Sequence, residues 1–211
     1  MIEYTHAETQ TLSTANETAV QYGPKRTWTF EEYMAAEELS VEKHEFHNGK
    51  RITMAGASKP HSIINISVGA AIINALNSIE DEDTEVCSND LKVFIPSINK
   101  AVYPDLTIVQ GEAIMKHKHV IKNPTLLVEV LSDSTEVYDR GDKFEHYKSL
   151  PSFKEYVLVA QNSPLVEVFY RENPDDKEWL HTRYEGLAAN VALRSIGCSL
   201  KMKDIYRRIF K

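Results

Sequence analysis

Two carboxylates stand in segments where a negative charge is unfavourable. The stretch "NPTLLVEVLSDST", residues 123–135, places Glu129 in the middle of a nearly continuous apolar run. Such a run is typical of a strand buried on both faces of a sheet. "VYPDLTIVQ" repeats the pattern, with Asp105 beside Pro104 at the head of a second apolar strand. Because a buried carboxylate is unfavourable unless its charge is compensated, both acids are candidate site residues.

Two adjacent strands would bring Asp105 and Glu129 together, and the chemistry they offer is metal binding. Like charges at close range repel each other and raise the pKa of one group, a conflict that a divalent cation removes. Carboxylate oxygens are hard ligands that suit Mg²⁺ or Mn²⁺. We therefore interpret both residues as metal ligands. For Glu129 a structural alternative stays open, in which the acid is held in an ion pair within the core.

A lysine completes this chemistry. Lys143 lies in "DRGDKFEHY", on the first turns of a helix predicted after the Glu129 strand. A lysine beside a metal can help to deprotonate or orient the attacking water, and it can balance the charge of a phosphate. A metal, two carboxylates and a lysine are the usual requirements of phosphodiester hydrolysis. Arg140 and Lys148 are rival cations nearby, and an exposed helix position is the structural alternative for Lys143.

The elements that must position these residues begin with two helices and a hairpin. Thr29 and Glu32 have capping-box spacing and open a helix in "TWTFEEYMAAEEL". "KHEFHNGKRITMAG" predicts a hairpin that turns at Asn48-Gly49. "PHSIINISVGAAIINALNSI" gives the longest helical pattern, and its small residues permit close packing against a sheet.

The rest of the chain is predicted to be rich in strands. We expect them at "TEVCS", "LKVFIP", "VYPDLTIV" and, after a loop at "MKHKHVIKN", at the Glu129 segment. A helix at "DRGDKFEHYKSL" is stopped by Pro151, and the strands "KEYVLVA" and "LVEVFYR" follow. A further hairpin and a short helix at "DIYRRIF" end the chain. This order indicates a mixed α/β fold, with one domain over residues 27–211 and a flexible polar arm over residues 1–26.

Composition limits the class of protein. The chain has 211 residues, of which 42% are hydrophobic, enough for one globular core. No apolar run approaches the roughly 20 residues that cross a bilayer. The first residues lack the basic start and apolar centre of a secretory signal. Cys87 and Cys198 are too far apart for a disulfide framework or a paired zinc knuckle. We therefore expect a cytoplasmic protein without membrane contact.

The charge balance limits what can be said about nucleic acids. With 31 acidic and 24 basic residues, the formal net charge is −7. A protein that coats nucleic acid in general would be basic. An enzyme with a local basic cleft remains compatible with this balance, so any role on DNA must rest on a site.

The segments around the acids also carry a family resemblance. "YPDLTIV" followed by "PTLLVEVLSDSTEVYDRGDKFEHYKSLPSFKEYVLV" closely resembles the Uma family of proteins assigned as endonucleases. "HEFHNGKRITMAGASKPH" looks like the entry segment of that family, and the resemblance extends over roughly residues 27–208. The family is placed in the PD-(D/E)XK superfamily. The resemblance therefore implies a restriction-endonuclease-like mixed β-sheet flanked by helices, with an N-terminal helix and a β-hairpin as an extension.

The resemblance also implies roles for individual residues. Asp105 corresponds to the motif aspartate and Glu129 to the motif acid. The lysine expected two places after the acid is Leu131 here, and Lys143 on the following helix is the candidate substitute. Glu45 resembles the extra acid that many such nucleases hold near the metal; the alternative is a hairpin ion pair with Lys43 or Lys50. The expected ligands of Mg²⁺, or of Mn²⁺ in its place, are thus Asp105, Glu129 and Glu45.

Other polar residues are weaker candidates. His61 starts the long helix and either caps it, lies on the surface or enters the site. Gln161 follows the "YVLVA" strand and either lines the cleft or belongs to a turn. The Lys116–His119 cluster is expected to be a solvated loop, with contact to the DNA backbone as the alternative.

Three functional hypotheses follow. The first is a Mg²⁺-dependent DNA endonuclease, for which a homodimer is natural because two strands must be cut. The second is a catalytically impaired nuclease-fold module that acts in DNA or protein binding. The third is a sugar- or nucleotide-processing hydrolase with the same metal chemistry. An intact site should bind Mn²⁺ and a scaffold should not, which separates the first hypothesis from the second.

Overall fold

A computed structural model describes residues 26–54 and 56–210 of the chain. All of the predicted flexible arm except Arg26 lies outside the described residues. The helical segments are α1 (Phe30–Glu38), α2 (Lys59–Ser78), the 3₁₀ turn η1 (Pro96–Ile98), α3 (Glu136–Tyr138), the π-helical segment η2 (Asp139–Lys143), α4 (Phe144–Lys148) and α5 (Met202–Tyr206).

The strands form two six-stranded mixed sheets and one two-stranded sheet. The first sheet has the order β2-β1-β5-β4-β8-β7, from strands β1 (His44–His47), β2 (Lys50–Thr53), β4 (Lys92–Ile95), β5 (Lys100–Val102), β7 (Met115–His117) and β8 (Val120–Ile121). The second has the order β12-β11-β10-β9-β6-β3, from strands β3 (Thr84–Ser88), β6 (Leu106–Gln110), β9 (Leu126–Leu131), β10 (Glu155–Ala160), β11 (Leu165–Tyr170) and β12 (Leu180–Glu185). The small sheet pairs β13 (Asn190–Leu193) with β14 (Cys198–Lys201).

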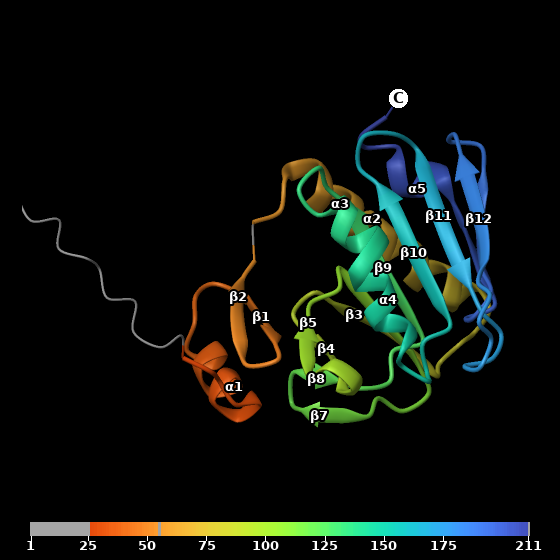
Figure 1. Ribbon diagram of the computed structural model, residues 1–211. Coiled ribbons are helices and arrows are strands. Elements are labelled where there is room, and N and C mark those ends of the chain that lie inside the picture. The colour runs from red at the N-terminus through yellow and green to blue at the C-terminus, as the bar shows by residue number, and fades with distance from the viewer. Residues whose placement is uncertain (1–25, 55, 211) are drawn as a thin grey trace, which may run out of the picture.

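The second sheet carries the elements that matter for the site. Its strands β9 and β10 are parallel, and α3, η2 and α4 form the crossover between them. In Figure 1 these helices lie in front of β9 and β10, as the crossover of a βαβ unit does. The long helix α2 packs on the opposite face, where it shares a core with Val128 and Val130 of β9.

Alternation along β9 separates two cores. Leu126, Val128 and Val130 belong to the core beneath α2 and α5. Leu127 and Leu131 belong to the core beneath α4, together with aromatic residues of α4 and β10. Because successive side chains of a strand point to opposite faces, Glu129 faces the crossover helices.

The N-terminal extension is confirmed as a helix and a hairpin. Thr29 and Glu32 form the predicted capping box at the start of α1. Asn48 and Gly49 have φ angles of 45° and 88°, the left-handed conformation that a tight hairpin turn requires. The helix packs on the first sheet through an aromatic cluster that includes Tyr33 and Phe46, whose rings stack 5.2 Å apart.

Two predictions about strands are wrong. The single strand expected over residues 102–109 is split into β5 and β6, which belong to different sheets. Pro104 lies in the break, where it lacks the N–H that a ladder needs. The loop expected at 115–123 instead forms the short antiparallel pair β7 and β8. The break at Pro104 matters for function because it places Asp105 at the start of β6, in the crossing between the sheets.

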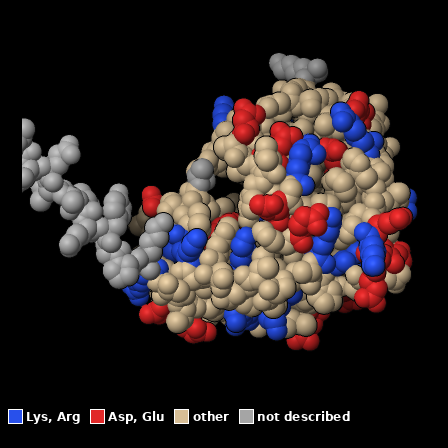
Figure 2. All heavy atoms as spheres, viewed as in Figure 1, with Lys and Arg blue, Asp and Glu red and all other residues tan. Residues whose placement is uncertain are grey.

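The surface does not carry a single sign of charge on the face that Figure 2 shows. Acidic and basic side chains are intermingled there. None of the described helices combines the length and apolarity needed to span a membrane. A DNA contact must therefore be sought at a local site, as the composition indicated.

Candidate active site

Asp105 and Glu129 lie on adjacent strands, as predicted. Strands β6 and β9 are antiparallel, with Leu106 opposite Val128 and Thr107 opposite Leu127. Asp105 immediately precedes β6, and its Oδ2 accepts the N–H of Val130, the residue after Glu129. Both acids therefore lie at this end of the β6–β9 pair and line the same cleft.

Glu129 is buried with a lysine as its direct partner. Its side chain is 4% exposed, and its Oε1 accepts from Lys143 Nζ at 2.7 Å and from the Tyr147 hydroxyl at 3.1 Å. Burial raises the pKa of Glu129 well above its ordinary value; the charge of Lys143 opposes this, while the charges of Asp139 and Asp105 add to it. Glu129 is thus a buried acid whose ionised form is favoured by the adjacent Lys143 ammonium.

Lys143 comes from the crossover between β9 and β10. Its ammonium contacts Glu129 at 2.7 Å and Asp139 at 3.2 Å, and its side chain is 7% exposed. Burial alone would lower the pKa of Lys143, but the charges of Glu129, Asp139 and Glu45 outweigh it and raise that pKa above its ordinary value. The lysine is therefore held as a cation. Its predicted place in the helical segment after the Glu129 strand is confirmed, and its catalytic role stays a prediction.

The rival cations point elsewhere. Arg140 pairs with Glu136 at 2.7 Å and with Glu167 at 2.6 Å. Lys148 pairs with Glu145 at 2.6 Å on its own helix. Neither residue lines the cleft, so Lys143 is the cation of this helix that reaches the acids.

Asp105 is held by one oxygen. Its Oδ2 accepts the backbone N–H of Val130 at 2.7 Å and lies 3.1 Å from His61 Nε2. Among the described residues, no hydrogen bond to its other oxygen, Oδ1, is found. Glu129 has the same arrangement, because its donors converge on Oε1 and leave Oε2 without a donor in the described part of the chain.

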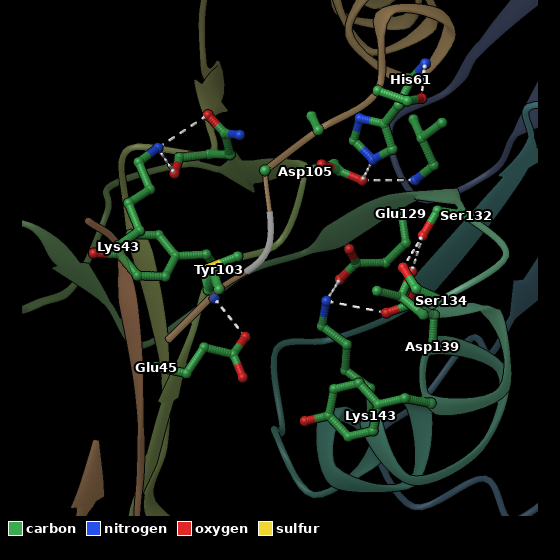
Figure 3. A pocket seen from close by; sticks show the side chains of 18 of the residues that line it. Lys43, Glu45, His61, Tyr103, Asp105, Glu129, Ser132, Ser134, Asp139 and Lys143 are labelled. Atoms are coloured by element: carbon green, nitrogen blue, oxygen red, sulfur yellow. Dashed lines mark hydrogen bonds and ion pairs between the residues drawn. The ribbon is translucent and has the colours of Figure 1, made fainter. Parts of the chain in front are cut away.

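Glu45 lies across the cleft from the other acids. It stands in β1, and Figure 3 shows it on the wall opposite Glu129 and Lys143. Its Oε1 accepts the Tyr103 N–H at 3.3 Å and its Oε2 contacts His47 Nε2 at 2.6 Å. Burial acts to raise the pKa of Glu45, but the His47 hydrogen bond and the charge of Lys143 hold it below its ordinary value. The side-chain partner in the hairpin is thus His47, and not the Lys43 or Lys50 of the structural alternative.

The weaker candidates fall into two groups. His61 and Gln161 line the cleft, and Gln161 Oε1 accepts from the Ser58 hydroxyl at 3.1 Å. The Lys116–His119 cluster instead packs on α1. There Lys116 lies over the Phe30 ring at 4.4 Å and Lys118 pairs with Glu38 at 3.0 Å.

The cleft has a volume of about 910 Å³ and lies where the two large sheets meet. Within residues 26–54 and 56–210, no three His, Cys, Asp or Glu side chains form a group that could hold a metal ion. The chemistry of Asp105 and Glu129 nevertheless fits a hard divalent cation, because each offers a carboxylate oxygen that has no donor in the described part of the chain. Glu45 fits less well, since both its oxygens are engaged. Its role as a metal ligand stays a prediction.

Comparison with known proteins shows the family of this chain. Residues 30–203 match the model of a family described as "Uma2: Putative restriction endonuclease". The chain belongs to the Uma2 family. All four residues singled out from the sequence, Asp105, Glu129, Lys143 and Glu45, lie within the matched range. The predicted resemblance is confirmed.

Similar proteins occur in cyanobacteria. The uncharacterized protein slr1290 of Synechocystis sp. is 36% identical over 177 residues, which cover 84% of this chain and 90% of the relative. The uncharacterized protein sll1609 of the same organism is 30% identical over 165 residues, with 77% and 90% coverage. A crystal structure described as "a putative nuclease belonging to DUF820" from Anabaena variabilis has a TM-score of 0.64 at 16% identity, covering 85% of this chain and 98% of that one. The likeness confirms that the two chains share a mixed α/β fold.

In this Uma2 protein the sequence reading missed two residues of the cleft. Asp139 is buried and contacts Lys143, and the spacing i, i+4 on a helix was the available signal. Tyr138 also lines the cleft, and its buried hydroxyl has no hydrogen-bond partner among the described residues. No pattern in the sequence distinguishes this tyrosine from a core aromatic.

Proposed function

We propose that this Uma2 protein is a divalent-cation-dependent endonuclease that hydrolyses phosphodiester bonds of DNA. The observation that carries the proposal is the edge shared by β6 and β9. Asp105 and Glu129 lie at one end of this strand pair, each with one oxygen that has no donor among the described residues, and a buried ammonium lies 2.7 Å from Glu129. This set supplies the negative ligands and the positive partner that phosphodiester hydrolysis needs.

Asp105 and Glu129 are the proposed ligands of Mg²⁺ or Mn²⁺. When bound, the cation would neutralise phosphate charge and acidify the attacking water. The two carboxylates would hold the cation in a fixed position, because donors already fix Oδ2 of Asp105 and Oε1 of Glu129. Burial raises the pKa of Glu129, the charges of Asp139 and Asp105 add to the rise, and a bound cation would offset the part that comes from these charges.

Lys143 is proposed to balance the charge of the reacting phosphate. The lysine is a buried cation, and Asp139 provides a second anionic partner at 3.2 Å. If Glu129 turns an oxygen toward a metal, Asp139 can keep the ammonium in place. Glu45, on the opposite wall, is proposed to complete the acidic cluster across the cleft.

Plasmid cleavage tests the proposal. Purified protein should convert supercoiled DNA to nicked or linear forms with Mg²⁺ or Mn²⁺, and a chelator should stop the reaction. Asp105→Ala should abolish cleavage. Asp204→Ala is the matched control, because this acid lies on α5 away from the cleft, with its side chain 48% exposed.

The outcome also separates the other hypotheses. DNA binding without cleavage in any metal, and without Mn²⁺ binding, would favour the impaired nuclease-fold module. Cleavage that survives Asp105→Ala would refute the assigned site. Hydrolysis of nucleotides or sugar phosphates by a protein that leaves DNA intact would favour the third hypothesis.

A further inference from the structure

The His61 side chain contacts Asp105, and helix capping does not account for this contact. It lies in the first turn of α2, where Ser58 is the N-cap and its hydroxyl accepts the His61 N–H at 3.2 Å. The imidazole is therefore not needed for capping. Its side chain is 14% exposed and is directed at the carboxylate of Asp105, as Figure 3 shows.

The imidazole faces the Asp105 carboxylate and the backbone of Val130. Nε2 lies 3.1 Å from Asp105 Oδ2, whereas Nδ1 is buried and unpartnered in the described part of the chain. A carboxylate only accepts hydrogen bonds, so Nε2 must carry the proton of this contact. A buried polar ring that satisfies one nitrogen and leaves the other unpaired is unfavourable as a purely structural device.

The contact determines which oxygen of Asp105 is engaged. Oδ2 receives donors from two directions, the Val130 N–H of β9 and the His61 ring of α2. A carboxylate with one hydrogen bond can still rotate about that bond. Two donors on the same oxygen fix the plane of the group and leave Oδ1 free for a ligand. One turn later on α2, Asn65 reaches the backbone oxygen of Asp105 at 3.5 Å, so the same helix face holds both parts of this residue.

We propose that His61 is a positioning residue, which donates to Oδ2 of Asp105 and so presents Oδ1 to a divalent cation in the cleft. This inference rests on the proposed function, because it assigns to Asp105 the part of a metal ligand. It is a hydrogen-bonding role in which the histidine itself touches neither metal nor substrate. Residues that orient a ligand in this way typically change metal affinity by about 10–100-fold when they are lost.

The two amide side chains provide a sharp test. The terminal nitrogen of glutamine lies as many bonds from Cα as Nε2 of histidine, whereas that of asparagine corresponds to Nδ1. His61→Gln can therefore retain the donor to Asp105, and His61→Asn cannot. His181→Ala is the matched control, since His181 contacts the Glu167 carboxylate at 3.0 Å outside the cleft.

Calorimetric titration with Mn²⁺ alone is the measurement. We expect His61→Ala and His61→Asn to weaken Mn²⁺ binding by about 10–100-fold. His61→Gln should remain close to the unsubstituted protein, and His181→Ala should be unchanged. If His61→Ala does not fold, the comparison of glutamine with asparagine still decides the matter.

Each other result overturns the inference in a recognisable way. Equal Mn²⁺ affinity in the unsubstituted protein and in His61→Asn refutes the positioning role but leaves the proposed function standing. Equal losses in the glutamine and asparagine variants, with a lowered Tm in both, indicate a packing role. Failure of the unsubstituted protein to bind Mn²⁺ removes the proposed function itself, and the inference with it.

Discussion

Replacing Lys143 by methionine tests whether its ion pairs are structural as well as functional. The methionine side chain keeps most of the length and apolar volume of the lysine stem but removes the ammonium. The ammonium lies 2.7 Å from Glu129 and 3.2 Å from Asp139, and all three side chains are at most 7% exposed. The variant leaves two buried carboxylates without their shared cation.

The structure sets the size of the effect. Removing one partner of a buried ion pair destabilises a protein by about 3–5 kcal/mol, because the other charge remains buried and uncompensated. For a chain of this size, a loss of 1 kcal/mol lowers Tm by about 2–4 °C. In the metal-free protein at neutral pH, Lys143→Met should therefore lower Tm by roughly 6–20 °C.

The loss should depend on pH with a defined sign. Burial raises the pKa of Glu129, and Lys143 is the group that opposes the rise. Without the lysine that pKa rises further. A carboxyl with a raised folded-state pKa contributes stability below its unfolded pKa of about 4.3, and this contribution is lost as pH rises through the folded value. The Tm difference from the unsubstituted protein should thus be smaller near pH 5 than near pH 8.

Thermal unfolding in a chelator, followed by circular dichroism, measures both effects. Lys148→Met is the matched control: it removes a lysine of the neighbouring helix whose pair with Glu145 is more exposed, so its effect should stay within about 1 kcal/mol. Lys143→Met should also abolish cleavage while Mn²⁺ still binds, because the lysine is not a ligand. A Tm like that of the control, at both pH values, would refute the buried ion pair.

Three further predictions concern the acids. Asp105→Asn, in a chelator, should leave the free energy of unfolding unchanged or raise it by up to about 2 kcal/mol, since it removes one repelling charge; a large loss of Tm would mark a structural residue. Glu45→Gln should weaken Mn²⁺ binding in calorimetry without changing the circular dichroism spectrum, and unchanged affinity would leave it as the partner of His47. Asp139→Asn should lower the rate of plasmid cleavage more than Mn²⁺ affinity, because it loosens Lys143; equal losses in both would make it a ligand.

The parts of the fold that were predictable are those with a strong local pattern. The apolar run around Glu129 indicated a strand buried on both faces, and its alternation then determines that this acid faces the crossover helices. A parallel β9 and β10 require a crossover that packs on the sheet, so Lys143 in its first turns comes to lie over Glu129. Local pattern and chain connectivity were sufficient for this contact.

Other parts depend on which partners a segment meets in the folded chain. The sequence left a hairpin pair with lysine as one alternative for Glu45, whereas its carboxylate contacts His47 and the backbone N–H of Tyr103. The strand expected over residues 102–109 was interrupted at Pro104 because its two halves pair in different sheets. The pairing of β5 with β1 and of β6 with β9 outweighed the continuous apolar pattern of this segment. Which strands a segment pairs with cannot be predicted from that segment alone.

The position of Leu131 shows why a helix supplies the cation. Leu131 faces the same side of β9 as Glu129, because residues two apart in a strand share a face. It is 4% exposed and belongs to a core cluster with Phe144 and Tyr156. An ammonium placed there would be surrounded by aromatic and aliphatic side chains, which is unfavourable without an anionic partner.

A lysine on the crossover avoids this conflict. The crossover covers the face of β9 that carries Glu129, so the Lys143 ammonium reaches the acid from the helix that packs on this face. Asp139, four residues before Lys143, provides a second anion for the ammonium. The apolar residues around Leu131 at the end of β9 include no such anion. Lys143 therefore brings an ammonium to Glu129 from the crossover instead of from position 131, and Leu131 stays part of the apolar core.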